Sequence, residues 1–423
     1  MAGKRDFLDD IIDIREDLSA LSKTGDNLVN SLGITDEEDE FIPSDYKERP
    51  RANSTYCSSA VTKNPEACKI CVDLCPSHSI VVTGAQVRIR QNCRKCGICA
   101  AACPTEVFVL RNNAPLALYD KVAKIASAYE QCYITCTRAL RRKPQANEVL
   151  LPCVGAIAKE VWFDLLCDFD NLVVYLPYGV CDKCRTTTGE EFFSEQIALA
   201  EEWSGESVGL VMDEREFTRE LKRAYKRTQF VSSVTQSATR LVTRATPLAG
   251  AQAVAARLQE HSKQITDLQK TLDAAVGSNT ASKRRRLLTR RRKLVMAGLQ
   301  KYPDLAEEMY LPFPEVDVDR CSMCGDCTKV CTVHALEMDA DGRVVLEPSY
   351  CVNCGVCERV CTEGAIRMVK TDAEELVVID EKQVEEREKQ RKRSKSVREK
   401  GKETLTKGLN YIESLADEDD EEE

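Results

Sequence analysis

The chain has 423 residues and a mass of 47.3 kDa, with 60 Lys and Arg against 69 Asp and Glu, a length that suggests about two or three domains. A mean hydropathy of -0.35 and the lack of any run of about 18 apolar residues exclude a transmembrane span. The acidic N-terminus has no secretion signal, so we expect a cytoplasmic protein. The 22 Cys therefore point to metal binding more than to disulfides, and three His leave little room for His-based catalysis.

The first fifty residues are acidic, with fourteen Asp and Glu against six Lys and Arg. Apolar residues from Phe7 to Leu21 recur at helical spacing and predict a short amphipathic helix, which either packs on its own chain or docks on a partner. The DEEDE run that follows is typical of a solvated linker. We therefore assign residues 1–50 to an acidic helix and linker.

The strongest signal is the pattern C-x2-C-x2-C-x3-C. A partial copy and three full copies occur, and each continues with a similar segment (CPSHSI, CPTEVF, CTVHAL and CTEGAI), so the repeat forms two pairs. Three cysteines spaced by two residues can direct their sulfurs to one point from a tight loop, whereas the fourth begins a short helix that points elsewhere. The full copies are Cys93-Cys96-Cys99-Cys103, Cys321-Cys324-Cys327-Cys331 and Cys351-Cys354-Cys357-Cys361, and the partial copy is Cys68-Cys71-Cys75.

Both pairs, in residues 51–112 and 311–371, resemble bacterial-type ferredoxins that carry two [4Fe–4S] clusters. In that family the fourth Cys of each copy binds the other cluster. The resemblance implies three complete ligand sets: Cys321, Cys324, Cys327 with Cys361; Cys351, Cys354, Cys357 with Cys331; and Cys93, Cys96, Cys99 with Cys75. Thr332 and Thr362 stand where the family usually has proline.

The fourth set contains Cys68, Cys71 and Cys103, but Pro65 stands where its leading Cys should be. Either Cys57 completes this set from upstream or the site holds a three-iron or lost cluster, so we expect three or four [4Fe–4S] clusters. Structural zinc is the alternative, but zinc sites usually combine two separated C-x2-C pairs. We interpret His78 and His334, which follow the fourth Cys of their copies, as surface residues.

Residues 113–213 alternate between helical and strand patterns. Helices are expected over 114–129, 156–167 and 189–203, and apolar strands over 131–136, 148–153, 171–179 and 207–212. This alternation predicts a small parallel α/β sheet. Its candidate ligands Cys136, Cys153, Cys181 and Cys184 lie at or just past strand ends, the edge at which open α/β sheets bind ligands.

The segments PCVGAI and VCDKC resemble the iron–sulfur domain of the delta subunit of methyl-viologen-reducing hydrogenases and related heterodisulfide-reductase proteins. The resemblance implies an additional [2Fe–2S] or [4Fe–4S] cluster in this region. A structural zinc, a redox-active C-x2-C at Cys181 and Cys184, and buried free thiols are the alternatives. We interpret Cys167 as a core thiol because Trp162, Phe163 and Leu166 surround it in sequence.

Residues 214–310 form a basic segment that is expected to be helical, with twenty Lys and Arg against five Asp and Glu over 215–301. We interpret its run SKRRRLLTRRRK as a solvated helix face, or as one that meets an acidic partner or the chain's own acidic tails. Contact with nucleic acid, through phosphate neutralisation, and peripheral contact with a membrane surface are the alternatives. Residues 372–423 are expected to form a charged helix over 380–412 and a disordered acidic tail.

The sequence therefore predicts an α+β multi-domain protein in which two ferredoxin-like modules flank a small α/β domain. We expect a multi-cluster electron-transfer protein or subunit that serves a larger flavo- or metalloenzyme, because one-electron steps need no acid–base residues. One alternative is an iron–sulfur-dependent regulator that binds nucleic acid through the basic segment. Another is a reductase whose substrate meets the middle-domain cysteines.

Overall fold

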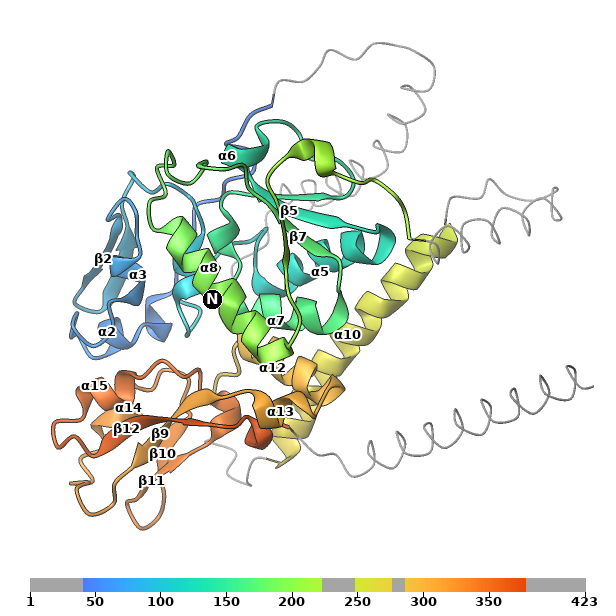
Figure 1. The fold of residues 1–423 in the computed structure, drawn as a ribbon. Helices are drawn as coiled ribbons and strands as arrows, with labels where there is room; N and C mark the ends of the chain where they lie inside the picture. The colour runs from blue at the N-terminus through green and yellow to red at the C-terminus, as the bar shows by residue number, and fades with distance from the viewer. Residues whose placement is uncertain (1–40, 223–247, 276–285, 378–423) are drawn as a thin grey trace, which may run out of the picture. The chain divides into compact units, whose positions relative to one another are not determined.

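Figure 1 shows the computed structural model of the chain, which describes residues 41–222, 248–275 and 286–377. The expected N-terminal helix, the DEEDE linker, the charged helix over 380–412 and the acidic tail lie outside the described residues. All contacts discussed below belong to the unit that begins at Ser44. No helix in the described part of the chain combines the length and the apolar character needed to cross a membrane.

Residues 51–112, the first cysteine block, fold into two small antiparallel pairs of strands. β1 (Arg51–Ala52) pairs with β4 (Phe108–Val109), and β2 (Ile80–Thr83) pairs with β3 (Gln86–Ile89). Short helices separate them: α2 (Ser58–Val61), α3 (Ile70–Asp73) and α4 (Ile98–Ala102). Four cysteines are buried in the core of this block together with Val107 and Phe108.

Residues 311–371, the second cysteine block, repeat this order. β9 (Leu311–Val316) pairs with β12 (Ile366–Thr371), and β10 (Leu336–Met338) pairs with β11 (Val344–Leu346). α14 (Asp326–Val330) comes before the hairpin of β10 and β11, and α15 (Val356–Val360) comes after this hairpin and before β12. The core of this block is small and contains Cys327 and Cys357 beside Leu336 and Ile366.

The middle domain contains the predicted parallel sheet. Its strands lie in the order β6-β5-β7-β8, and all neighbours are parallel: β5 (Cys132–Cys136), β6 (Glu148–Leu151), β7 (Leu172–Tyr175) and β8 (Gly209–Val211). The helix α5 (Pro115–Ala128) precedes the sheet, α7 (Lys159–Asp168) connects β6 to β7, and α8 (Gly189–Ser204) connects β7 to β8 (Figure 1). β5, β6 and β7 are buried along their whole length, which explains their continuous apolar sequence.

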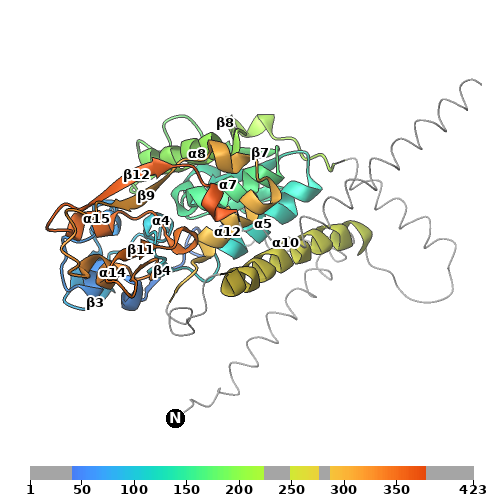
Figure 2. The ribbon, with the colours of Figure 1, turned by 90° about the horizontal axis from the view of Figure 1, so that it is seen from below.

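The described part of the basic segment contains two long helices, α10 (Leu248–Ala275) and α12 (Arg290–Lys301), and the short α13 (Leu305–Glu308). α10 packs beside α5 and α12 (Figure 2). His261 connects α10 to two neighbouring helices. Its ring nitrogen Nε2 lies 2.9 Å from the carboxylate of Asp164 on α7, and its ring stacks on Tyr119 of α5 with 4.0 Å between the ring centroids. Both partners are largely buried, so this histidine has a structural role in the packing of α10.

The interpretation of SKRRRLLTRRRK as a solvated helix face is wrong for the first turn of α12. Arg291 is 4% exposed and Arg292 is 5% exposed. Thr289 begins the helix and accepts a hydrogen bond from the Arg292 amide at 3.2 Å. The following residues Leu294 to Leu299 are buried, and they bring the two guanidinium groups inside the protein, where backbone carbonyls accept hydrogen bonds from their terminal nitrogens.

Candidate metal centres

The cysteine loops of both blocks share a backbone conformation. In each full copy of the motif, left-handed φ angles of 54° to 56° occur two residues after the leading Cys, and the glycine after the second Cys also has positive φ. A third left-handed residue follows the fourth Cys by three positions in all four copies. These residues are Lys95, Met323 and Asn353; Gly97, Gly325 and Gly355; and His78, Glu106, His334 and Gly364. The three full copies therefore share one tight loop conformation, which is compatible with sulfurs that converge on one point.

The fourth Cys of every copy accepts a hydrogen bond to sulfur from the backbone amide four residues later. The N···S distances are 3.3 Å for Cys75, 3.4 Å for Cys103, 3.3 Å for Cys331 and 3.3 Å for Cys361. This turn therefore holds the fourth sulfur of each copy in the same way. Amide donors stabilise negative charge on sulfur, as a metal-binding thiolate requires.

Cys57 comes into contact with the cysteines of the incomplete set. Burial raises the pKa of the Cys57 thiol, and the nearby Cys103 and Cys68 raise it further. Burial likewise raises the pKa of Cys71, with added repulsion from the other three. All four thiols line one cavity, which Cys354 and Val356 of the second block also line. The geometry thus brings Cys57 to the place that Pro65 leaves without a thiol, and we name Cys57, Cys68, Cys71 and Cys103 the Cys57 set.

The second quartet of the first block is Cys75, Cys93, Cys96 and Cys99, the Cys75 set. Burial raises the pKa of Cys96 to about 11, and its thiol neighbours are Cys93 and Cys75. Burial also raises the pKa of Cys99, whose neighbours include Cys71 of the Cys57 set. The two sets therefore adjoin within the block.

Hydroxyl groups surround the fourth cysteines of the first block. Ser79 Oγ lies 3.3 Å and Ser77 Oγ 3.8 Å from the sulfur of Cys75, and Thr105 Oγ1 lies 3.5 Å from that of Cys103. Burial acts to raise the pKa of Cys75, but the hydrogen bonds from Ser79 and Ser77 lower it overall. The sequence analysis did not single out these residues, although each follows its Cys by two or four positions.

The second block contains two corresponding quartets. Burial raises the pKa of Cys357, with Cys354, Cys351 and Cys331 as thiol neighbours, and these four form the Cys331 set. Burial raises the pKa of Cys327, with Cys321 and Cys324 as neighbours, and Cys361 packs against the same core as Cys327. Cys321, Cys324, Cys327 and Cys361 form the Cys361 set, in which Cys324 is exposed.

The four candidate cysteines of the middle domain also converge. Cys136 ends β5, Cys153 follows β6, and Cys181 and Cys184 follow β7, and all four line one cavity at this edge of the sheet. Burial raises the pKa of Cys181 to about 12, with Glu190 and the thiols of Cys136 and Cys184 adding to the rise. We name Cys136, Cys153, Cys181 and Cys184 the middle set.

The middle set adjoins the first block. Burial raises the pKa of Cys153, and its thiol neighbours include Cys96 of the Cys75 set. Gly97 allows this approach, because a Cβ at that position would lie 2.8 Å from the Cβ of Ala156, and its φ of 89° suits glycine. Two other thiols stay apart: Cys132 is buried at the start of β5, and Cys167 is half-buried where α7 faces Gly298 of α12.

Two consecutive arginines of α12 reach cysteine loops of different blocks. Arg291 donates to the carbonyl oxygens of Cys103 and, at 2.5 Å, Ala101. Arg292 donates to the carbonyl of Cys351 and to Oδ1 of Asn353, the latter at 2.5 Å. Loss of hydration lowers the pKa of Arg292, and nearby Cys351 and Glu160 act against that shift. Buried cations beside thiols would offset negative charge on these ligand sets.

The donor sets have the chemistry that an iron–sulfur cluster needs. In the described part of the chain, no three His, Cys, Asp or Glu side chains gather tightly enough to hold a single metal ion. The cysteines instead form wider groups of four, whose members raise one another's pKa after burial. Such groups become stable thiolates only when they bind a positively charged partner, and thiolates are the ligands that hold iron–sulfur clusters.

Residues 320–365 match the family model of a 4Fe–4S dicluster domain. The match covers both cysteine motifs of the second block, so this block binds 4Fe–4S clusters and supports an iron–sulfur electron-transfer role. No curated protein and no solved structure matches the chain. The cluster content of the first block and of the middle set stays a prediction.

Proposed function

We propose that the chain is a multi-cluster electron-transfer protein in which the first block is a second dicluster module and the middle set holds a further cluster. The observation that carries the proposal is the backbone repeat: the first block has the strand order, left-handed turns and sulfur-bound amides of the second block, which matches the 4Fe–4S family model. Cys57 would complete its set in place of a Cys at Pro65.

The five sets contact one another in a single order. The middle set adjoins the Cys75 set through Cys153 and Cys96, and the Cys75 set adjoins the Cys57 set through Cys99 and Cys71. The Cys57 set in turn adjoins the Cys331 set, which shares its block with the Cys361 set. This order gives electrons one route between two ends, the middle domain and the exposed Cys324.

The chain's own residues bind, shield and tune these sites. Clusters bound there would accept and release single electrons, chemistry that requires no proton donor. Buried positions such as Cys71 and Cys357 exclude water from the ligand sets. Hydrogen bonds to sulfur from Ser79 and Thr105 would raise the potentials of their sets by stabilising the more negative reduced state.

The test is the iron and acid-labile sulfide content of anaerobically purified full-length protein, with low-temperature EPR after reduction. Five sets predict about twenty iron atoms per chain, or about eighteen if the middle set holds a two-iron cluster. About eight iron atoms would restrict the clusters to the second block and contradict the proposal. One or more zinc atoms per chain without matching sulfide would instead favour a structural metal in the middle set.

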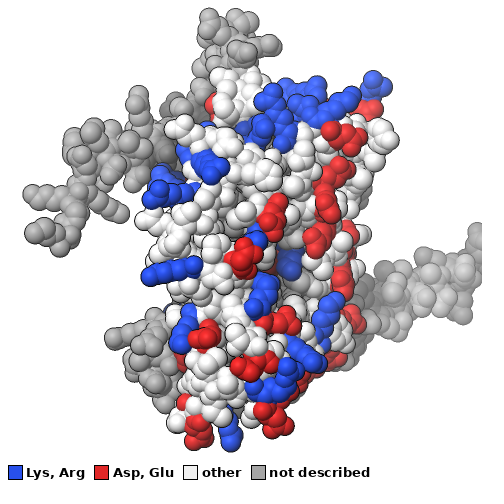
Figure 3. Space-filling model, turned by 90° about the vertical axis from the view of Figure 1, so that its left-hand side faces the viewer, with Lys and Arg blue, Asp and Glu red and all other residues white. Residues whose placement is uncertain are grey.

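We further propose that a redox partner with an acidic surface docks at the middle-domain end. Arg138 lines the cavity of the middle set and donates to the carbonyl of Lys183 at 2.8 Å. Exposed basic side chains surround this edge, namely Arg138, Arg141, Lys143, Lys183 and Arg185. Figure 3 shows Lys and Arg gathered at the upper edge of a face whose remainder mixes both signs. Charge complementarity of this kind accelerates association and is weakened by salt.

An acidic flavodoxin, reduced chemically, serves as the probe for this docking surface. Reduction of the chain should slow as ionic strength rises, and Lys183→Glu with Arg185→Glu should slow it at low salt. Lys329→Glu, at the opposite end beside Cys324, is the matched control and should leave the rate unchanged. Equal effects at both ends would contradict docking at the middle domain.

A further inference from the structure

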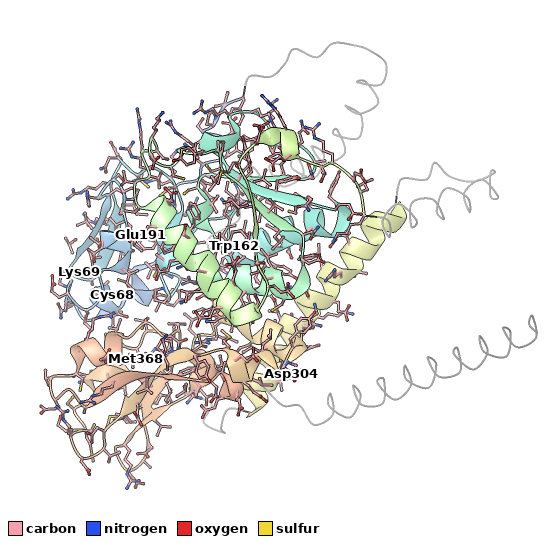
Figure 4. All side chains as sticks on the ribbon, in the orientation of Figure 1. Cys68, Lys69, Trp162, Glu191, Asp304 and Met368 are labelled. Carbon is pink, nitrogen blue, oxygen red and sulfur yellow. The ribbon has the colours of Figure 1, made fainter. Side chains whose placement is uncertain are left out.

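The contact between the two blocks lies at the Cys57 set and the Cys331 set. Cys354 lines the same cavity as the four thiols of the Cys57 set. Cys68 and Cys354 also pack against one small apolar cluster, which joins Ala67 to Val330 and Val356. Figure 4 labels Cys68 on the side of the first block that faces β12 and Met368.

Arg359 connects the two ligand loops at this contact. Its Nε donates to the carbonyl of Ala67, the residue before Cys68, at 3.1 Å. A terminal nitrogen of the same guanidinium donates to the carbonyl of Cys354, also at 3.1 Å. One rigid, planar side chain thus holds the backbone beside a ligand of one set to the backbone of a ligand of the other.

Lys329 occupies the position of Arg359 in the preceding copy of the motif. Its ammonium lies 3.4 Å from the carbonyl of Cys324 and 2.9 Å from Asp326, both within its own block. The contact with the local loop is therefore common to both copies, whereas the contact with the first block belongs to Arg359. This difference provides a matched control.

Thr332 makes the second connection. Its hydroxyl donates to the carbonyl of Tyr56, the residue before Cys57, at 3.0 Å. Proline, which ferredoxin motifs usually have after the fourth Cys, has no hydroxyl and could not make this bond. Thr362 replaces the same proline in the other copy and is exposed. The substitution at 332 is thus explained by the contact between the blocks.

We propose that Arg359 and Thr332 are positioning residues that hold the Cys57 set against the Cys331 set, so that electrons cross between the two blocks here. The inference rests on the proposed function of the first block. The crossing moves one electron, oxidises one set and reduces the other, and makes or breaks no bond; redox partner proteins supply and remove the electron. The rival arrangement is two independent carriers that happen to share a chain.

The test compares Arg359→Met with Thr332→Val in one full-length variant against the matched variant Lys329→Met with Thr362→Val. Both proteins are reduced with dithionite. Low-temperature EPR reports magnetic interaction between sets, and hydrogen exchange reports the segment 54–71. We expect the first variant to keep its iron and to lose the part of the EPR line broadening that arises from interaction between the two blocks. The amides of residues 54–71 should exchange about tenfold faster in this variant. The matched variant should behave as the unaltered protein.

Unchanged broadening in the first variant, with full iron content, would overturn the proposal. If that variant loses iron, Thr332→Val alone and Arg359→Lys with Thr332→Ser give the decisive comparison. Thr332→Val removes a single hydroxyl and should reduce the EPR line broadening between the blocks. Arg359→Lys with Thr332→Ser keeps a hydrogen-bond donor at both positions and should retain that broadening. Absence of iron from the first block of the unaltered protein would contradict the proposed function. A full complement of iron without magnetic interaction between the blocks would contradict only this inference.

Discussion

The two cysteine blocks have the same order of strands and loops but complete their ligand sets differently. In the second block every candidate ligand belongs to a C-x2-C-x2-C-x3-C copy, and the family model matches it. In the first block Cys57, in the turn before α2, lies beside Cys103 and Cys68, and we propose that it replaces the cysteine missing at Pro65. A ligand set depends on where sulfurs lie in space, so a residue outside the repeat can fill it.

The blocks also differ in what surrounds their cysteines. The core of the first block includes Ala60, Ile80, Val107 and Phe108 beside four cysteines. The core of the second has Leu336 and Ile366 beside two cysteines. Hydroxyl groups lie near Cys75 and Cys103. Ser79 follows Cys75 by four positions, where the second block has Ala335 and Ala365, and Thr105 follows Cys103 by two positions, where the second block has Val333 and Glu363. We therefore expect the cluster around Cys327 and Cys357 to depend more on bound metal for its stability than the larger cluster of the first block.

Iron removal gives the largest expected effect. An iron chelator should abolish hydrogen-exchange protection throughout residues 311–371, because the cluster of buried residues around Cys327 and Cys357 has only Leu336 and Ile366 as further members. The first block should retain partial protection, and the sheet of the middle domain, built around Trp162, Tyr133 and Phe163, should stay protected. Peptide-resolved exchange before and after chelation measures this. Equal loss in both blocks would show that the difference between their cores is unimportant.

Loss of Cys57 should affect the first block alone. Cys57→Ala should produce a three-iron EPR signal or the loss of about four iron atoms per chain. Cys167→Ala is the control, because this half-buried thiol has no cysteine neighbour. Signals from the second block should persist in both variants. If Cys57→Ala retained every iron atom, the fourth ligand of that set would have to come from elsewhere.

The smallest expected effect concerns reduction potential. Ser79→Ala removes a hydroxyl near the Cys75 sulfur and should lower the potential of that set by about 40 mV, since a hydrogen bond contributes about 1 kcal/mol. Ala335→Ser makes the opposite change at the matching position of the second block and should raise the potential there. EPR-monitored redox titration measures both. A shift of the same sign in the two variants would remove sulfur hydrogen bonding as the cause.

Much of this arrangement could be predicted from sequence because the signals are local. Loop spacing predicted the grouping of cysteines within each motif, and alternating apolar segments predicted the parallel sheet that gathers the middle set at one edge. The assignment of Cys57 left two alternatives open, since only the folded chain shows which thiol lies beside Cys68 and Cys103.

The contacts made by long basic side chains could not be predicted. Arg291 and Arg292 look like part of a solvated charge run, yet their acceptors are carbonyls of Cys103 and Cys351, far away in sequence. The roles of Arg359 and Thr332 could not be predicted either, because each donates to a backbone carbonyl of the first block, which is distant in sequence. A charge run beside apolar residues, as in RRRLLTRRRK, was the only available signal of burial.

The burial of Arg291 against the carbonyl of Cys103 also has a consequence for how the protein is made. The loop that contains Cys103 leaves the ribosome long before residue 291 does, so during synthesis this loop lacks its contact with Arg291. If the first block binds clusters as proposed, its cysteine loops would stay accessible to the machinery that delivers iron and sulfide until α12 has been synthesised. Packing of α12 against the block would then be a late step of maturation that covers the loop of Cys103.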